Sequence, residues 1–221
     1  MRYVIIGAGM AGMLAAIKLL EKGCRNLAVY EKGPTVGGTW RENTYPGLTC
    51  DVPSHSYTYS FELNPTWTRT QPPGPEVQAY FEGVKEKYDL KDWIRFNEEV
   101  VSCVFQKSRW QLKTASGVQD IADVVIAATG VLHHPRYPDI PGTDEFEGAI
   151  FHSAKWDHSV PLDGKRIAII GTGSTGVQLV SALSARASEL THFQRTPQWI
   201  MPVEDRAYQE EELERFRNDP D

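Results

Sequence analysis

Short apolar runs that end in glycine turns alternate with helix-like apolar repeats along this chain. Residues 3–9 (YVIIGAG) have the pattern of a short buried strand that enters a turn. Residues 10–23 carry apolar side chains at intervals of three and four, which is typical of a helix, and residues 26–32 (NLAVYEK) predict a second strand. Strand, helix and strand in this order open a doubly wound sheet of the Rossmann type.

The middle of the chain is less regular. Residues 37–74 are rich in Gly, Pro, Thr and aromatic side chains, which predicts a long functional loop with short strands. Residues 75–90 predict a helix with a proline in its first turn. Residues 98–106 and 109–115 predict a pair of strands, and residues 121–130 predict a buried strand that ends in a tight turn.

The opening pattern then returns after a proline-rich linker. Pro135, Pro138 and Pro141 mark this linker, because proline stiffens the chain and stops helices. Residues 165–187 predict a strand, a glycine turn and a helix, and residues 189–196 predict the next strand. The charged residues 204–221 predict a solvated surface helix. We therefore expect an α/β fold with a Rossmann-like domain at 1–141 and the start of a second one at 142–221.

Composition narrows the class of protein. A formal net charge of −6 over 221 residues argues against a nucleic-acid binder, which needs a basic face. Three cysteines at spacings that fit neither a metal site nor a redox pair favour a reducing compartment, and we expect a cytoplasmic protein. Lys18 interrupts the apolar N-terminal run, so no membrane span is expected. The histidines show no metal-ligand spacing.

The first glycine motif predicts a dinucleotide site. Gly7 permits a tight turn, Gly9 lets the backbone approach a pyrophosphate, and Gly12 lets the helix pack on the strand. Free N–H groups at the helix N-terminus then face the phosphates. Glu31 ends the second strand, where an acid accepts hydrogen bonds from ribose hydroxyls, as in FAD or NAD. The candidate binding residues of this turn are Gly7, Ala8, Gly9, Met10, Ala11 and Gly12.

The second glycine motif, residues 171–176 (GTGSTG), predicts a second dinucleotide site, which prefers a phosphorylated ribose. Where the first site has an acid, this one has Arg195, and a cation suits the 2′-phosphate of NADP. Thr196 adds a hydroxyl. A plain surface arginine is the alternative interpretation. FAD with NADPH is the economical pairing of two such sites, since hydride passes from a nicotinamide to a flavin.

Two longer motifs resemble signatures of type I Baeyer–Villiger monooxygenases, which belong to the class B flavin monooxygenases. Gly37-Gly38-Thr39-Trp40, Tyr45-Pro46-Gly47 and Asp51 are similar to the first signature. Residues 146–157 (FEGAIFHSAKWD) are similar to the second, FxGxxxHxxxW followed by Pro or Asp. Trp156 weighs against related enzymes that oxidise nitrogen or sulfur, which usually have another aromatic there. The resemblance covers essentially the whole chain but only the N-terminal part of the family's length.

The resemblance implies roles for individual residues. Asp51 would stand between flavin and nicotinamide and orient a catalytic cation, while His152 and Trp156 would couple cofactor movement to flavin reduction. Trp40 as plain core, Asp51 as a turn cap and His152 as a pin for the linker remain alternatives. The implied FAD contacts add Gly38, Thr39, Trp40, Asp51, Tyr57 and the backbone of Val100, and the implied NADP contacts are Thr49, Cys50, Asp51, Thr172, Gly173, Ser174, Thr175, Gly176, Val177, Gln178, Arg195 and Thr196.

The resemblance also implies an activity. Such enzymes use FAD, NADPH and O2 to insert one oxygen atom next to a ketone carbonyl, which gives an ester or a lactone. No arginine here matches the context of the family's catalytic arginine. Three alternatives stay open: a part that a second chain completes, a catalytically impaired FAD-binding fragment, and a monooxygenase that oxidises nitrogen or sulfur. We also expect unpaired strands and an exposed apolar face to make this chain poorly stable alone.

Overall fold

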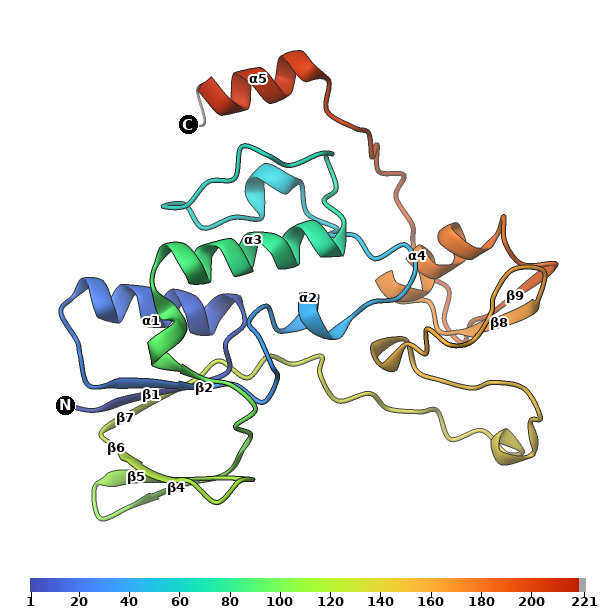
Figure 1. The fold of residues 1–221 in the computed structure, drawn as a ribbon. Coiled ribbons are helices and arrows are strands. Elements are labelled where there is room, and N and C mark those ends of the chain that lie inside the picture. The colour runs from blue at the N-terminus through green and yellow to red at the C-terminus, as the bar shows by residue number, and fades with distance from the viewer. Residues whose placement is uncertain (219–221) are drawn as a thin grey trace. The chain divides into compact units, whose positions relative to one another are not determined.

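The computed structural model describes residues 1–218, which fold into two compact units (Figure 1). Unit 1 consists of Met1–Glu42 and Gln78–His133, and unit 2 consists of Asn43–Val77 and His134–Asp221. The predicted domain bounds, 1–141 and 142–221, stay a prediction. The units show where the loop after residue 42 belongs: it packs with the second glycine motif.

A parallel sheet forms the centre of unit 1. Its strands are β1 (Tyr3–Ile6), β2 (Leu27–Tyr30), β3 (Ile94–Arg95) and β7 (Val124–Ala127), in the order β3-β2-β1-β7. Helix α1 (Met10–Glu21) connects β1 to β2 and buries Met13, Ala16 and Ile17. The predicted strand–helix–strand opening is confirmed, because uninterrupted apolar runs are what strands buried on both faces require.

A small antiparallel sheet packs against this centre. It contains β4 (Val100–Gln106), β5 (Arg109–Thr114) and β6 (Gln119–Ala122) (Figure 1). The predicted strand pair is present, and β6 adds a third strand. The single strand predicted at 121–130 is divided in the structure: Ile121 and Ala122 end β6, and β7 begins at Val124. A shared core joins the two sheets; its members are Val4, Ala28, Tyr30, Leu112 and Ala122.

The predicted loop at residues 37–74 contains none of the short strands we expected. It holds helix α2 (Thr39–Glu42), a 3-10 turn at Ser54–Ser56 and isolated bridges such as Thr49 with Pro73. Prolines remove the N–H donors that a strand ladder needs, so the loop pairs its backbone only at single points. Helix α3 (Gly74–Lys87) follows and begins one residue before Pro75.

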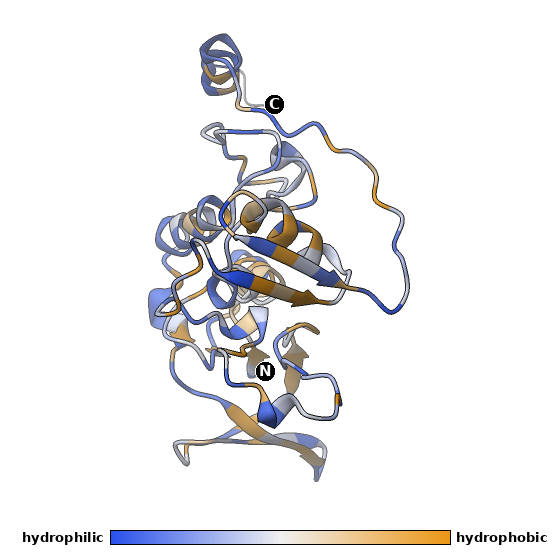
Figure 2. Cartoon of the chain, turned by 90° about the vertical axis from the view of Figure 1, so that its right-hand side faces the viewer, coloured by the Kyte–Doolittle hydropathy of each residue, from blue (hydrophilic) through white to orange (hydrophobic). Residues whose placement is uncertain are grey.

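Unit 2 contains the second strand–helix–strand motif, as predicted. Strands β8 (Arg166–Ile170) and β9 (Glu189–Phe193) pair in parallel, and α4 (Ser174–Leu183) connects them. Figure 2 shows hydrophobic positions gathered on these elements. One core cluster of this unit contains Tyr45, Ile169, Leu179 and Leu183, so the loop before α3 contributes Tyr45 to it.

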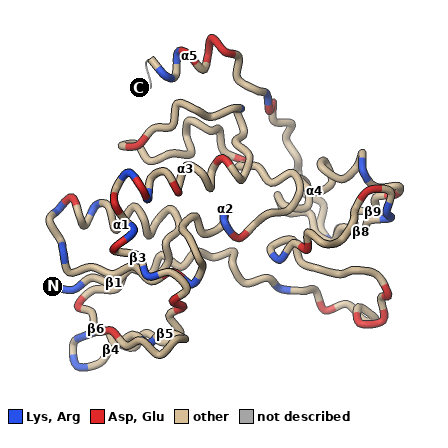
Figure 3. The backbone as a smooth tube through the Cα atoms, in the orientation of Figure 1, with Lys and Arg blue, Asp and Glu red and all other residues tan. Residues whose placement is uncertain are grey.

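The C-terminal helix α5 (Glu210–Asn218) has no buried residue, so the predicted surface helix is present, and it also contacts part of that loop. Residues 219–221 of the predicted helix lie outside the described residues. The acids of α5 lie in the first turn and its arginines in the last, as Figure 3 shows, an arrangement that suits the helix dipole. The ring of Phe216 lies 4.1 Å from that of His55, and the hydroxyls of Tyr208 and Ser54 are 2.9 Å apart. Arg69 and Asp205 form an ion pair of 2.7 Å.

Within residues 1–218, no helix is both long and apolar enough to cross a membrane.

Gly47 holds the loop against α4. Its φ is +81°, and a Cβ added there would lie 2.8 Å from the Ala182 Cβ and 2.9 Å from the Gln178 carbonyl oxygen. The glycine of the Tyr-Pro-Gly motif therefore serves close packing on a helix.

We predict that Gly47→Ala lowers the free energy of unfolding by about 2–4 kcal/mol, the sum of left-handed backbone strain and overpacking. Gly164→Ala is the control, because Gly164 also has a positive φ, +71°, but nothing within 4 Å of the added Cβ. The control should cost about 1 kcal/mol. Urea unfolding measures both, and equal losses would contradict the packing role.

Candidate functional site

The first glycine turn of unit 1 is built as the motif predicts. Gly7 has a φ of +101°, and a side chain on it would clash with the Ala128 carbonyl. A side chain on Gly12 would clash with the Gly7 carbonyl, so α1 lies directly on the strand end. The helix begins at Met10 with Gly9 as its N-cap, and its first turn carries no acid. The N-terminus of a helix suits an anion because its first N–H groups point away from the helix.

A second glycine backbone lies against this turn. A Cβ on Gly38 would be 3.2 Å from the Gly9 Cα, and the Gly37 N–H donates to the Ala8 carbonyl at 3.1 Å. Neither of these two glycines brings a side chain to the start of α1. This arrangement fits a pyrophosphate, which needs close backbone approach.

Glu31 faces the glycine turn and is 3% exposed. Its Oε2 accepts from the Ala8 N–H at 2.7 Å, and its Oε1 accepts from the Gly33 N–H at 2.8 Å. Arg41 donates to the same Oε1 at 2.9 Å. Each carboxylate oxygen can accept two hydrogen bonds, so within residues 1–218 Oε2 retains room for one more donor, such as a ribose hydroxyl.

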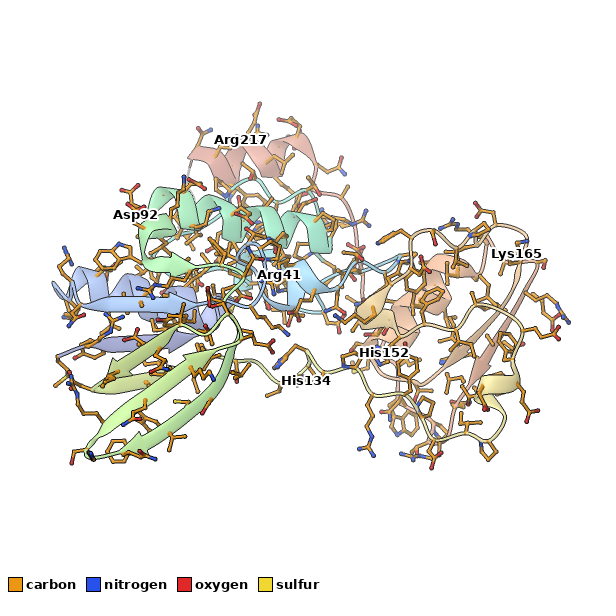
Figure 4. The ribbon with its side chains drawn as sticks, turned by 60° about the horizontal axis from the view of Figure 1, so that its bottom comes forward. Arg41, Asp92, His134, His152, Lys165 and Arg217 are labelled. Atoms are coloured by element: carbon orange, nitrogen blue, oxygen red, sulfur yellow. The ribbon has the colours of Figure 1, made fainter. Side chains whose placement is uncertain are left out.

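Sequence reasoning missed Arg41, which is labelled in Figure 4. Its guanidinium pairs with Glu31 at 2.9 Å and with Glu42 at 2.9 Å, and its side chain is 12% exposed. A side chain on Gly33 would clash with this guanidinium. Arg41 directly follows the predicted Trp40, but nothing in its spacing distinguished it from a surface arginine.

The remaining predicted residues of unit 1 lie on nearby segments. Thr39 is exposed and Trp40 is half-buried, both in α2. Val100 begins β4 beside a shift in strand register. The Glu98 N–H donates to the Glu31 carbonyl at 2.9 Å, so the chain that enters β4 is tied to the end of β2. Unit 1 thus brings Glu31 close to the segment of Val100.

The second glycine turn repeats the construction of the first. Gly171 has a φ of +113°, and a side chain on Gly176 would clash with the Gly171 carbonyl. His192, which sequence reasoning also missed, lies with Nε2 2.8 Å from that carbonyl oxygen. The Thr172 hydroxyl donates to the Thr196 carbonyl at 3.2 Å. Gly173 and Ser174 are exposed at the start of α4, while Thr175 and Val177 are half-buried.

Gln178 ties the first signature to the second glycine motif. Its Oε1 accepts from the Tyr45 hydroxyl at 2.8 Å and from the Thr49 N–H at 3.5 Å. Its Nε2 donates to the Thr49 carbonyl at 3.0 Å and to Asp51 Oδ1 at 2.7 Å. A carboxamide has two donor and two acceptor positions, and all four are used. Its role as an NADP contact stays a prediction, and its side chain is already hydrogen-bonded within the protein.

The two signatures meet in the core of unit 2. Trp156 packs against the cluster that contains Tyr45, and its ring contacts Phe151 edge-on with centroids 4.9 Å apart. The Thr44 hydroxyl and His158 Nε2 are 2.8 Å apart. Burial raises the pKa of the Tyr45 hydroxyl above its ordinary value.

His152, labelled in Figure 4, makes hydrogen bonds to residues of the linker and of its own turn. Its Nδ1 accepts from the Ala154 N–H at 3.1 Å, which caps the 3-10 turn Ser153–Lys155. The backbone N–H of His152 donates to the Tyr137 hydroxyl at 3.1 Å, and the rings of the two residues meet edge-on. These contacts hold the linker in place, and a role toward a cofactor stays a prediction.

The other predicted residues of unit 2 differ in exposure. Cys50 is 3% exposed, and burial raises the pKa of its thiol, so its side chain faces the interior. Tyr57 is half-buried, whereas Asp51, Arg195 and Thr196 are exposed. Among residues 1–218 no group of three His, Cys, Asp or Glu side chains could hold a metal ion.

One predicted correspondence is wrong. We expected Arg195 at the place where the first site has Glu31. The Gly7 N–H donates to the Tyr30 carbonyl and the Gly171 N–H donates to the Phe193 carbonyl, so Tyr30 and Phe193 are equivalent. The residue after each is Glu31 in unit 1 and Gln194 in unit 2. Arg195 therefore corresponds to Lys32.

Comparison with known proteins agrees with this construction. Residues 4–217 match a family described as pyridine nucleotide-disulphide oxidoreductase. The chain belongs to this family. Among curated relatives, an uncharacterized monooxygenase of Mycobacterium tuberculosis is 55% identical over 90% of this chain and 40% of its own length. A Baeyer–Villiger monooxygenase of Streptomyces coelicolor is 46% identical over 93% of this chain and 40% of its own length.

Solved structures give the same family likeness. Cyclohexanone monooxygenase from Rhodococcus sp. Phi1 bound to NADP+ matches 99% of this chain and 42% of its own, with a TM-score of 0.89 and 37% identity. Further matches include an FAD-binding monooxygenase of Aspergillus terreus and a structure in complex with FAD and NADP. The resemblance to Baeyer–Villiger monooxygenases is confirmed, and the chain spans about 40% of the length of these relatives.

We predict that Gln178→Met destabilises the chain by about 2 kcal/mol, because Tyr45, Thr49 and Asp51 lose partners together. Limited proteolysis should show faster cleavage between Tyr45 and Pro53, and urea unfolding should show the loss of stability. Gln198→Met is the matched control, since Gln198 is exposed. Unchanged cleavage in Gln178→Met would contradict the role of this carboxamide.

Proposed function

We propose that unit 1 binds FAD at the turn Gly7–Gly12. Three observations of this structure support the fit: the bare backbones of Gly9 and Gly38 at the start of α1, the acid-free first turn of that helix, and the remaining acceptor position on Glu31 Oε2. Gly7 to Gly12 would hold the pyrophosphate, Glu31 the ribose and the Val100 backbone the adenine. Gly38, Thr39 and Trp40 would line the flavin, and the resemblance implies the same role for Asp51 and Tyr57.

We propose that unit 2 binds NADP(H) at the turn Gly171–Gly176. The observation that carries both proposals is the shared construction of the two turns, in which the third glycine packs on the carbonyl of the first. Thr172 to Val177 would surround the pyrophosphate, and the exposed Arg195 and Thr196 would meet the 2′-phosphate. Thr49, Cys50 and Asp51 would approach the nicotinamide, with Cys50 through its backbone because its side chain is buried.

We further propose a Baeyer–Villiger reaction for the protein to which these residues belong, in which one oxygen atom of O2 is inserted beside a ketone carbonyl. The two signatures and the relatives support it. Bound FAD supplies the redox chemistry with NADPH and O2. This chain's own part is to hold both dinucleotides and to fix the Asp51 carboxylate, which Gln178 orients as a hydrogen-bond acceptor.

We also propose that the protein lies in the cytoplasm. Cys24, Cys50 and Cys103 are free thiols, which suits a reducing compartment.

A spectrum of the purified chain, followed by NADPH oxidation with and without cyclohexanone, tests the proposed function. Bound FAD, ketone-stimulated NADPH oxidation and a lactone product are the expected result. Oxygenation of a sulfide or amine without lactone would favour the alternative oxidation of nitrogen or sulfur. Bound FAD without NADPH oxidation would favour an impaired FAD-binding fragment, or one that a second chain must complete. A chain that binds no FAD would contradict the first proposal.

We predict that Glu31→Gln weakens FAD binding at least about tenfold. A carboxamide can accept from only one of the Ala8 and Gly33 N–H groups, and Arg41 loses one of its two ionic partners and keeps Glu42. Fluorescence titration of the apoprotein measures the affinity, and thermal unfolding without FAD separates loss of fold from loss of ligand. Glu145→Gln, at an exposed position, should bind FAD like the parent. Parent-like affinity in Glu31→Gln would refute the role of the carboxylate.

A further inference from the structure

The backbone itself aligns the two dinucleotide turns. Strand β1 pairs Ile6 with Tyr30, and strand β8 pairs Ile170 with Phe193. In each case the next residue, a glycine of positive φ, donates its N–H to the carbonyl of the paired aromatic residue, at 2.8 Å in unit 1 and 3.0 Å in unit 2. The positions that follow the second strand can therefore be compared one by one.

A cation follows in both units, so it does not distinguish them. Lys32 of unit 1 is exposed and pairs with Glu42 at 3.3 Å. Arg195 of unit 2 occupies the equivalent place and is exposed. The chemical difference lies one residue earlier, where unit 1 has the carboxylate of Glu31 and unit 2 has the carboxamide of Gln194.

The two side chains also differ in what they do. Glu31 joins Ala8 to Gly33 by accepting from both N–H groups. The equivalents of Ala8 and Gly33 in unit 2 are Thr172 and Thr196, and the Thr172 hydroxyl joins them directly at 3.2 Å.

Because Thr172 bonds directly to Thr196, the Gln194 side chain is not needed to join these two segments. Gln194 is exposed, and its side chain makes no hydrogen bond in the part of the chain that the structure describes. Its carboxamide is therefore available to a ligand at the place where Glu31 stands in unit 1.

We propose that Gln194 determines the preference of unit 2 for NADP over NAD. A carboxylate at this place accepts from ribose hydroxyls and repels a phosphate, whereas the Gln194 carboxamide donates to the 2′-phosphate without adding negative charge. The Arg195 guanidinium would attract the 2′-phosphate, and Gln194 puts no negative charge beside that phosphate. This inference rests on the proposed binding of NADP(H) to unit 2.

The test is Gln194→Glu in the full chain, with NADP+ and NAD+ titrated separately by calorimetry. The substitution keeps the side-chain shape and recreates the residue type of unit 1. We expect the ratio of the two dissociation constants to shift toward NAD+ by at least about tenfold, because one charge-assisted hydrogen bond becomes a repulsion. Gln111→Glu makes the same change at an exposed position of β5 in unit 1 and should leave the ratio unchanged.

Different outcomes test the role of Gln194 and the proposed binding of NADP(H) to unit 2. If the parent prefers NADP+ and Gln194→Glu keeps that ratio, the inference is wrong and the proposed NADP site stands. If the parent binds both dinucleotides equally, the inference is also wrong. If the parent binds neither, the proposed NADP site falls, and the inference falls with it. Equal thermal unfolding of the two variants shows that the change lies in recognition.

Discussion

The close approach of a helix to the carbonyl of a glycine positions both candidate sites. In each unit the third glycine of the motif lies so near the first that even one methyl group would clash, at Gly12 on Gly7 and at Gly176 on Gly171. This contact places the first turn of the helix at the end of the strand, where N–H donors and the helix dipole suit an anion. A larger residue would push the helix away and separate those donors from the acid or amide on the neighbouring strand.

The sequence was sufficient for this part of the structure because the constraint is local. Glycine spacing, a preceding apolar run and a following helical repeat are all contiguous, so both strand–helix–strand motifs could be predicted together with their turns. The short strands expected in residues 37–74 were wrong, since a proline-rich segment held by single contacts looks much like one with brief strands. Residues 121–130 were predicted as one strand because their apolar run is nearly continuous, whereas the structure ends β6 at Ala122 and begins β7 at Val124.

Long-range contacts account for what the sequence could not predict at the sites. Gln178 was expected at a cofactor because it follows a nucleotide motif, yet its carboxamide is engaged by three residues far away in sequence. Arg41 and His192 support their sites through hydrogen bonds that no spacing predicts. Arg195 was matched with Glu31 as the charged residue at the end of the second strand, whereas the register of backbone hydrogen bonds matches it with Lys32.

The signature that resembles Baeyer–Villiger monooxygenases therefore combines two kinds of residue. Gly47 and Tyr45 pack on α4 and in the core of unit 2, while Asp51 is exposed and held by the same helix through Gln178. A motif residue need not touch a ligand, because the packing residues fix the position of the one that can. Since α4 begins at the second glycine turn, the helix that would bind a pyrophosphate also determines where this carboxylate lies. The spacing between Tyr45 and Asp51 is then a consequence of fitting one short loop to one helix.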